Sequence, residues 1–221
     1  MHEESLQQIP RIVVLISGSG SNLQALIDAI AAGTIIATIE LVISNTAEAK
    51  GLARANKAGI ATQVINHLEF SSRDAFDREL IHAIDDKQPE LVVLAGFMRI
   101  LTTNFTQHYH ARMLNIHPSL LPQFKGINTH ERAIEAEVEQ HGASVHFVTD
   151  ELDGGPIVLQ AIVPVLDLDS PTVLATRVLA QEHVIYPIAI KWFCEGRLTL
   201  AKNTVLMDGH PLPAQGMPYL A

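Results

Sequence analysis

Two side chains that could take part in catalysis lie two residues apart in the stretch Met113–Pro122, MLNIHPSLLP. On an extended strand Asn115 and His117 point to the same face, because side chains alternate along a strand. The strand would end in a proline-containing loop, and the carboxyl ends of strands in an open α/β sheet are the usual place for chemistry. Alternatively, both groups are buried and satisfied by backbone partners. The rest of the chain has to decide between these interpretations.

The elements that would position these residues follow from an alternation of apolar β-branched runs with helical spacings. Strands are predicted at 11–16, 41–45, 61–65, 91–95, 113–117, 142–148 and 157–165, and helices at 23–30, 50–58, 71–84, 129–138 and 170–193. Pro187 should kink or divide the last helix, 142–165 should form a hairpin, and the tail from Leu198 should form a short β-ribbon. The alternation predicts an α/β fold with a Rossmann-like, mostly parallel twisted sheet and helices on both faces.

Composition limits the class of protein. The 221 residues are 48% hydrophobic and 18% charged, which fits one folded domain and excludes disorder. We expect residues 1–10 to be a flexible N-terminal extension and 11–221 to be a single domain. The net charge of −9 argues against a nucleic-acid partner. We expect no membrane span, no secretory signal and a cytoplasmic location, because apolar runs are short and the start is polar. The single Cys194 suits a reducing compartment.

A glycine- and serine-rich loop, Ser17–Asn22, separates the first strand from the first helix. Glycines let the backbone approach a ligand closely, while free N–H groups and the helix dipole favour an anion such as phosphate. The loop is not a Walker A motif, and Leu23 occupies the third glycine position of G-x-G-x-x-G. No acidic residue ends the second strand, so dinucleotide binding is disfavoured. A tight strand-to-helix turn is the structural alternative.

Three further segments would lie at the same edge of the sheet. Gly96–Leu101 is an apolar loop that either packs on the core or forms a wall for a flat aromatic ligand. Thr149–Pro156 is acidic and places Asp153 before two glycines, a common turn composition. Arg73 lies in a helix's first turn, where it is either a surface residue or faces a ligand. Together these loops predict an anion site, an apolar wall, an amide–imidazole pair and a carboxylate in one crevice.

Four motifs in order make the chain similar to a known family. They are VLISGSGSNLQ, LAGFMRIL, LNIHPSLLP and SVHFVTDELDGGP. The chain resembles the phosphoribosylglycinamide formyltransferases, folate-dependent enzymes of purine synthesis, from about Arg11 to the C-terminal ribbon. The likeness is weakest at residues 1–10, at 123–140 and at the end. It implies the formyltransferase fold and transfer of the formyl group of 10-formyltetrahydrofolate to the amino group of glycinamide ribonucleotide. The folate would be a co-substrate, and no metal is implied.

The resemblance also implies roles for particular residues, carried over where the motifs match. The catalytic residues would be Asn115, His117 and Asp153. The phosphate of the ribonucleotide would bind at Gly20, Ser21 and Asn22, and the rest of that substrate at Leu179, Ala180, Gln181 and Glu182. The folate would be held by Arg73, Met98, Arg99, Ile100, Leu101, Asn115, Thr149, Asp150, Glu151, Leu152 and Asp153.

The residue types suit this chemistry. When an amine attacks the formyl carbon an oxyanion develops, and Asn115 and a protonated His117 could each donate a hydrogen bond to it. A free histidine, with a pKa of about 6.5, is mostly neutral at cytoplasmic pH. Asp153 would raise the pKa of His117 and assist transfer of the proton that leaves the amine, directly or through water. The amine is itself the nucleophile, so a serine triad using Ser119 is disfavoured.

Three alternatives use parts of the same pattern. A 10-formyltetrahydrofolate hydrolase needs the same three residues but usually carries an N-terminal regulatory domain. A methionyl-tRNA formyltransferase shares the Asn-x-His segment but adds a nucleic-acid-binding domain, for which we expect no room here. A non-catalytic ligand sensor would be expected to lack one of the three residues. Small-molecule substrates are the expected partners, and the protein is expected to be a monomer or a weak homodimer.

Overall fold

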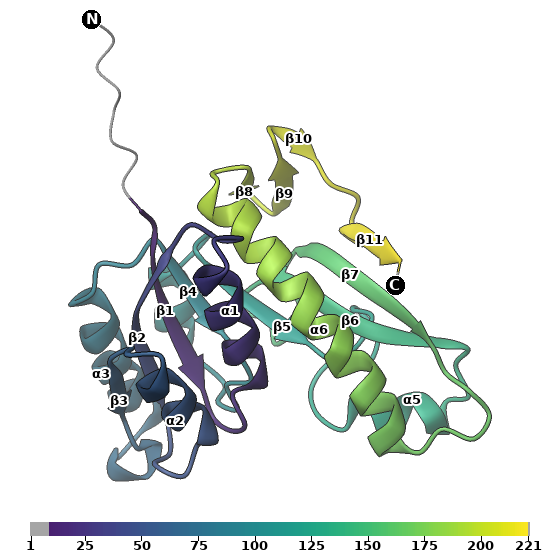
Figure 1. Cartoon of the computed structure of the whole chain (residues 1–221), viewed down its shortest axis with the longest axis horizontal. Helices are drawn as coiled ribbons and strands as arrows, with labels where there is room; N and C mark the ends of the chain where they lie inside the picture. Colours follow the sequence, from purple (N-terminus) through teal and green to yellow (C-terminus); the bar gives the residue numbers. More distant parts are fainter. Residues whose placement is uncertain (1–8, 221) are drawn as a thin grey trace, which may run out of the picture.

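The computed structural model describes residues 9–220, so most of the expected extension at 1–10 lies outside the described residues. Eight strands form one open twisted sheet with the spatial order β11-β7-β6-β5-β4-β1-β2-β3 (Figure 1). In chain order they are β1 (Arg11–Ile16), β2 (Thr38–Ser44), β3 (Thr62–Val64), β4 (Leu91–Leu94), β5 (Met113–His117), β6 (Gln140–Phe147), β7 (Ile157–Pro164) and β11 (Met217–Leu220).

The sheet is mixed but mostly parallel. The five strands β1 to β5 pair in parallel, β6 runs antiparallel between β5 and β7, and β11 is parallel to β7. The predicted α/β class and the β6–β7 hairpin are therefore confirmed. Strand β11 was not predicted from the sequence. It contains Pro218 in only four residues and extends the sheet at an edge, where a missing N–H is tolerated.

Helices cover both faces of the sheet, as the alternation predicted. They are α1 (Ser21–Ala31), α2 (Lys50–Lys57), α3 (Arg73–Asp85), α4 (Thr103–His108), α5 (Thr129–Glu135) and α6 (Pro171–Cys194), with a 3₁₀ turn at His67–Glu69. Along β1, Ile12, Val14 and Ile16 pack into the core with α1 and α6. Val13 and Leu15 point to the other face and pack with α3 and α4. This period of two is what a strand buried on both faces requires.

Of the two effects predicted for Pro187, a kink or a division, the structure excludes division, because helix α6 runs without interruption from Pro171 to Cys194. Ser170 caps the helix, because its side chain accepts a hydrogen bond from the backbone N–H of Val173, and Pro171 occupies the first turn as predicted. Pro187 is buried and follows Tyr186, which packs into the core. We attribute the continuity to this packing, which outweighs the single backbone hydrogen bond that proline cannot donate.

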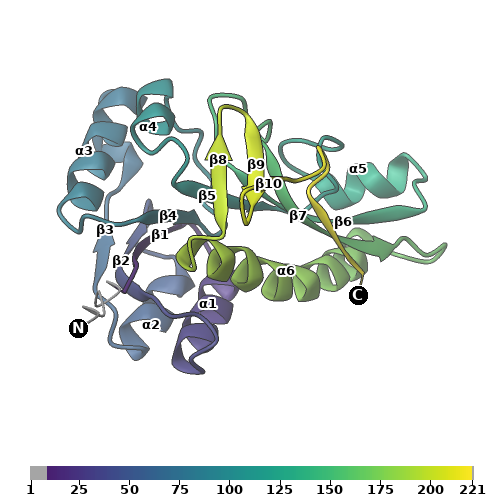
Figure 2. The same ribbon diagram turned by 90° about the horizontal axis from the view of Figure 1, so that it is seen from above.

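The predicted C-terminal ribbon is confirmed as a small antiparallel sheet. It comprises β8 (Leu198–Ala201), β9 (Thr204–Met207) and β10 (His210–Pro211), seen from above in Figure 2. Buried Leu198 and Val205 join it to the core that contains α6. The chain then returns to the main sheet as β11, which closes the edge beside β7.

Candidate active site

The loops predicted to meet do meet at the carboxyl ends of β1, β4 and β5. These strands are neighbours in the sheet, so their ends lie side by side. The backbone N–H of Ser17 donates to the carbonyl of Gly96 over 3.1 Å, and the N–H of Met98 donates to Oγ of Ser17 over 2.7 Å. The glycine-rich turn after β1 and the apolar loop after β4 are thus fixed to each other.

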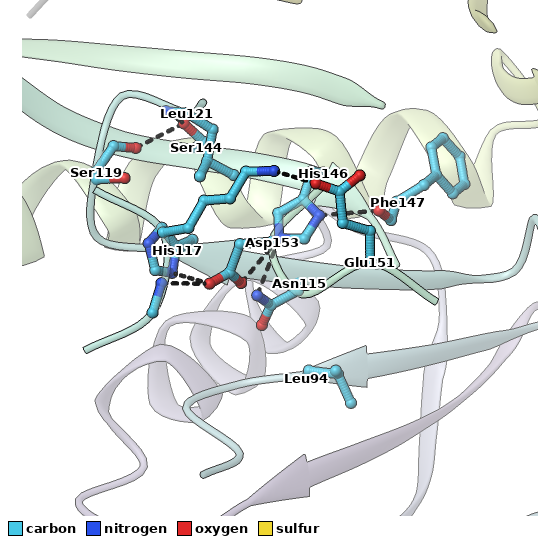
Figure 3. A network of polar contacts seen from close by, with 12 residues as sticks. Leu94, Asn115, His117, Ser119, Leu121, Ser144, His146, Phe147, Glu151 and Asp153 are labelled. Atoms are coloured by element: carbon cyan, nitrogen blue, oxygen red, sulfur yellow. Dashed lines mark hydrogen bonds and ion pairs between the residues drawn. The ribbon is translucent and has the colours of Figure 1, made fainter. Parts of the chain in front are cut away.

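The three predicted catalytic residues are brought together by β5 and the acidic loop between β6 and β7 (Figure 3). Nδ1 of His117 lies 3.5 Å from Oδ2 of Asp153, and both side chains are more than nine-tenths buried. Asp153 has a left-handed φ of +48°, and the loop then returns through Gly155. A Cβ at Gly155 would lie 1.8 Å from the carbonyl oxygen of Phe147, so only glycine fits there. This tight return directs Asp153 toward β5.

His146 orients the amide of Asn115. The two residues are directly opposite in the antiparallel β5–β6 pair, and Nδ2 of Asn115 lies 3.1 Å from Nε2 of His146. Nδ1 of His146 donates to the carbonyl oxygen of Phe147 over 2.9 Å, which leaves Nε2 as the acceptor. Burial lowers the pKa of His146 to about 4, so the ring is neutral at pH 7 and its 3.8 Å contact with Asp153 is not an ion pair.

The sequence analysis assigned no role to His146, so this contact was not predicted. The signal that could have revealed it is the register between β5 and β6. With β5 antiparallel to β6, a pairing that sets His117 opposite Ser144 necessarily sets Asn115 opposite His146. The alternation of small or polar with apolar residues along β6 indicated a strand but gave no register.

Both ring nitrogens of His117 have partners in this structure. Nε2 donates to the carbonyl oxygen of Phe124 over 3.0 Å, while Nδ1 faces Asp153. The backbone N–H of Gly126 donates to Oδ2 of Asp153 over 2.9 Å. The turn at residues 124–126 therefore satisfies both members of the catalytic pair, although the sequence analysis assigned it no role. A substrate that accepts a hydrogen bond from Nε2 has to replace the Phe124 carbonyl.

A buried polar network supports the loop that follows His117. Oγ of Ser144 donates to the carbonyl of Ser119 over 2.6 Å and accepts from the N–H of Leu121 and from Nε2 of Gln160, at 3.0 and 2.8 Å. Nε2 of Gln160 also donates to the carbonyl of Leu121 over 2.9 Å. Because the Ser144 hydroxyl is fully used, the network holds the loop in one conformation.

The glycine-rich turn has the geometry of an anion site. Gly20 adopts a left-handed conformation with φ of +68° and caps α1 without a side-chain hydrogen bond, and no acidic residue occupies the first turn. Nδ2 of Asn22 donates to Oε2 of Glu182 over 2.7 Å, which joins this turn to α6. Burial raises the pKa of Glu182, which is 7% exposed. Leu179, Ala180 and Gln181 lie on the preceding turn of α6.

The residues expected to hold a folate differ in their exposure and in their protein partners. Met98 and Ile100 expose 68% and 53% of their surface, whereas the neighbouring Leu101 packs on the core. Two acidic side chains of the loop have protein partners. The carboxylate of Asp150 accepts from the side chains of Thr106 and Gln107, and that of Glu151 pairs with Lys125. The remaining positions, Arg73, Arg99, Thr149 and Leu152, lie at the start of α3 or in the two loops.

Two other histidines, His130 and His141, lie near His117. His141 is fully buried with no hydrogen-bond partner on either nitrogen among the described residues, and its ring packs edge-on against His130 at 5.2 Å. Burial lowers the pKa of both, that of His141 to about 4. Within residues 9–220 no group of three or more histidine, cysteine or acidic residues is arranged to hold a metal ion. Over the same range, no helix has the length and apolarity needed to cross a bilayer.

Comparison with known proteins connects this geometry to characterised relatives. The family described as Formyl transferase matches residues 10–190. The phosphoribosylglycinamide formyltransferase of Escherichia coli is 58% identical over 205 residues, 93% of this chain and 97% of the relative, and that of Haemophilus influenzae is 50% identical over 206 residues, covering the same shares. The solved structure of the phosphoribosylglycinamide formyltransferase of Coxiella burnetii, in complex with CHES, superposes with a TM-score of 0.92 at 51% identity, covering 96% of this chain and 100% of that one.

Proposed function

The chain belongs to the formyl transferase family, and we propose that it transfers the formyl group of 10-formyltetrahydrofolate to the amino group of 5′-phosphoribosylglycinamide. The products would be formylglycinamide ribonucleotide and tetrahydrofolate, in the de novo synthesis of purines. The observation that carries the proposal is the meeting of Asn115, His117 and Asp153 at the carboxyl end of β5, on the edge where the glycine-rich turn also ends. A nucleotide phosphate at the turn and a formyl carbon at the three residues would lie at the same edge of the sheet, because β1, β4 and β5 are neighbours.

The proposed reaction is direct attack of the substrate amine on the formyl carbon. A C–N bond forms to the glycinamide nitrogen, the bond from the formyl carbon to N10 of the folate breaks, and the proton lost by the amine goes to N10. The carbonyl oxygen carries negative charge in between. Nδ2 of Asn115 has two hydrogens, and its contact with His146 uses one, so the other can stabilise this oxyanion.

His117 and Asp153 would act as a pair. The carboxylate, held by the Gly126 N–H, faces Nδ1 of His117 and can stabilise positive charge that develops on the ring. Nε2 of His117 can donate to the oxyanion after Phe124 releases it. Asp153 can also accept the amine proton, directly or through one water, and pass it on toward N10. No side chain has to become covalently attached to the formyl group.

The substrates would be held at two sides of this centre. The phosphate would lie at Gly20–Asn22 on the amino end of α1, with Glu182 toward the ribose. The folate would lie against the apolar loop at 98–101 and the acidic loop at 149–153, where Met98 and Leu152 expose apolar surface. We also infer that the enzyme needs no metal, works in the cytoplasm and is a monomer or weak homodimer.

The acceptor dependence of formyl release tests the proposal. Purified protein with 10-formyltetrahydrofolate should release formyl groups, followed by folate absorbance, only when glycinamide ribonucleotide is added. Equal release with and without the ribonucleotide would identify a hydrolase, for which water is the acceptor. Absence of release under both conditions would favour a ligand-binding protein without catalytic activity.

A further inference from the structure

Helix α2 packs directly against the glycine-rich turn. A Cβ at Gly20 would lie 2.4 Å from Cα of Gly51, and a Cβ at Gly51 would lie 2.5 Å from Cδ1 of Ile16. The backbone N–H of Gly51 donates to the carbonyl of Gly18 over 3.1 Å. Two glycines thus let the first turn of α2 contact the backbone of the turn, with no side chain between them.

Arg54, one helical turn further along α2, connects the residue before Gly20 with the first turn of α1. Its Nε donates to the carbonyl of Ser19 over 2.9 Å, and its Nη1 donates to Oε1 of Gln24 over 3.3 Å. Ser19 precedes the left-handed residue, whereas Gln24 lies in the first turn of α1 and donates in turn to Asp28. The guanidinium therefore fixes the direction in which α1 leaves the turn, and with it the direction of the free N–H groups.

Arg54 also brings a permanent positive charge to this place. The chain carries a net charge of −9, which opposes the approach of a phosphate dianion. The first turn of α1 contains no charged side chain. Burial, and after it the charge of Arg54, lowers the pKa of His183, which follows Glu182 on α6. The charge of Arg54 therefore acts as far as α6.

We propose that Arg54 is a positioning residue for the 5′-phosphate of the substrate, holding the Ser19–Asn22 turn in its phosphate-binding conformation and adding positive charge behind it. The inference rests on the proposed function. It assigns Arg54 to recognition of the phosphate, and not to the formyl centre or the folate. Its consequence is a preference for the phosphorylated substrate over the corresponding riboside.

The test compares glycinamide ribonucleotide with its dephosphorylated riboside in wild type, Arg54→Met and Arg54→Lys. Arg54→Met should lower kcat/KM for the ribonucleotide about 10- to 100-fold, mainly through KM, since it removes charged hydrogen bonds. The KM for 10-formyltetrahydrofolate and the kcat/KM for the riboside should stay within about twofold. Arg54→Lys should recover part of the loss, because it restores the charge without the two-point contact. Lys57→Met, which removes an exposed charge from the last turn of the same helix, is the matched control.

Several outcomes would overturn the inference. An Arg54→Met enzyme with unchanged kinetics for the ribonucleotide would do so, as would one that loses the same factor with the riboside, because that pattern reports general damage. If Arg54→Met fails to fold, as judged by thermal melting, Arg54→Lys and Gln24→Leu provide the same comparison of the two substrates. A wild type that transfers no formyl group would overturn the proposed function too, whereas an active wild type with an unaffected Arg54→Met overturns the inference alone.

Discussion

At the scale of single residues, the site depends on a neutral histidine that is buried behind Asn115. His146 accepts from Asn115 only while Nε2 is unprotonated, and its burial ensures this at pH 7. Its other nitrogen is held by the Phe147 carbonyl, which fixes the tautomer. The orientation of the Asn115 amide is thus determined by a side chain on the neighbouring strand, and not by Asn115 itself.

Replacing His146 with leucine should therefore impair catalysis more than binding. Without its acceptor the Asn115 amide can rotate away from the oxyanion. We therefore expect kcat to fall at least about 10-fold, but by less than it falls when an oxyanion donor is removed outright. KM for both substrates should change little. Steady-state kinetics of wild type and His146→Leu measure the effect. The control is His82→Leu, which alters an exposed histidine on α3. A His146→Leu enzyme with wild-type kcat would show that Asn115 needs no such support.

The residue types at the centre could be predicted from the sequence, but their supports could not. Asn115 and His117 share a face of β5 because of strand periodicity, and this held. The approach of Asp153 depends on a left-handed residue and on the clearance at Gly155, which a one-dimensional pattern does not contain. The His146 contact requires the β5–β6 register, and the Phe124 contact requires the path of a loop.

At the scale of elements, the turn at residues 124–126 is the part that has to rearrange. It supplies the Phe124 carbonyl to His117 and the Gly126 N–H to Asp153, the two groups to which we assign the proton chemistry of the proposed reaction. The nearby pair of Lys125 with Glu151 is largely exposed, with 70% of the Glu151 side chain accessible. Such a pair contributes on the order of 0–1 kcal/mol, so it does not hold the turn shut.

We expect substrates to release this turn. In the free enzyme the Gly126 amide should be protected from hydrogen exchange by its bond to Asp153. In a complex with the ribonucleotide and a non-transferable folate analogue, that protection should drop, while the amide of Val92, bonded to Arg112 within the sheet, stays protected. NMR exchange measurements on both amides decide the matter. Equal protection of Gly126 in both states would contradict the release of this turn by substrates.

The order of elements was predictable because each obeys a local rule. The buried strands are continuous apolar runs in the sequence, and Ser170 followed by Pro171 predicted the start of α6. The local rule that proline interrupts a helix fails at Pro187, where tertiary packing keeps α6 continuous. Helix α4 was missed because six residues give too short a periodic pattern, and β11 because its strand character comes from pairing with β7.

At the scale of the whole molecule, buried neutral histidines link stability to pH. His141 and His146 are 0% and 2% exposed, and burial lowers the pKa of each to about 4 from an ordinary 6.5. Between these values the unfolded chain binds protons that the folded chain does not. The free energy of unfolding should therefore fall as pH drops from 6.5 toward 4. The buried carboxyls of Asp77 and Glu182, whose pKa values are raised, act in the opposite direction.

Comparison of wild type with His141→Leu isolates this contribution. Neither ring nitrogen of His141 has a hydrogen-bond partner among the described residues, so leucine should remove the titration and change mainly the ring packing against Phe124 and His130. Between pH 7 and pH 5 the variant should lose less unfolding free energy than wild type, by on the order of 1–2 kcal/mol. Urea unfolding at the two pH values measures the free energy of unfolding, with His110→Leu as the exposed control. Parallel losses in all three proteins would argue against a neutral His141.

The central claim is that formyl transfer takes place at Asn115, His117 and Asp153, and the Asp153→Asn enzyme tests it most directly. The substitution keeps the size of the side chain and removes the charge that faces His117 at 3.5 Å. With both substrates saturating, we expect kcat for ribonucleotide-dependent formyl release to fall by about 10² or more, while binding of glycinamide ribonucleotide, followed by calorimetry, is unchanged. A variant that keeps kcat within about threefold of wild type would contradict the account, because the carboxylate would then take no part in the reaction.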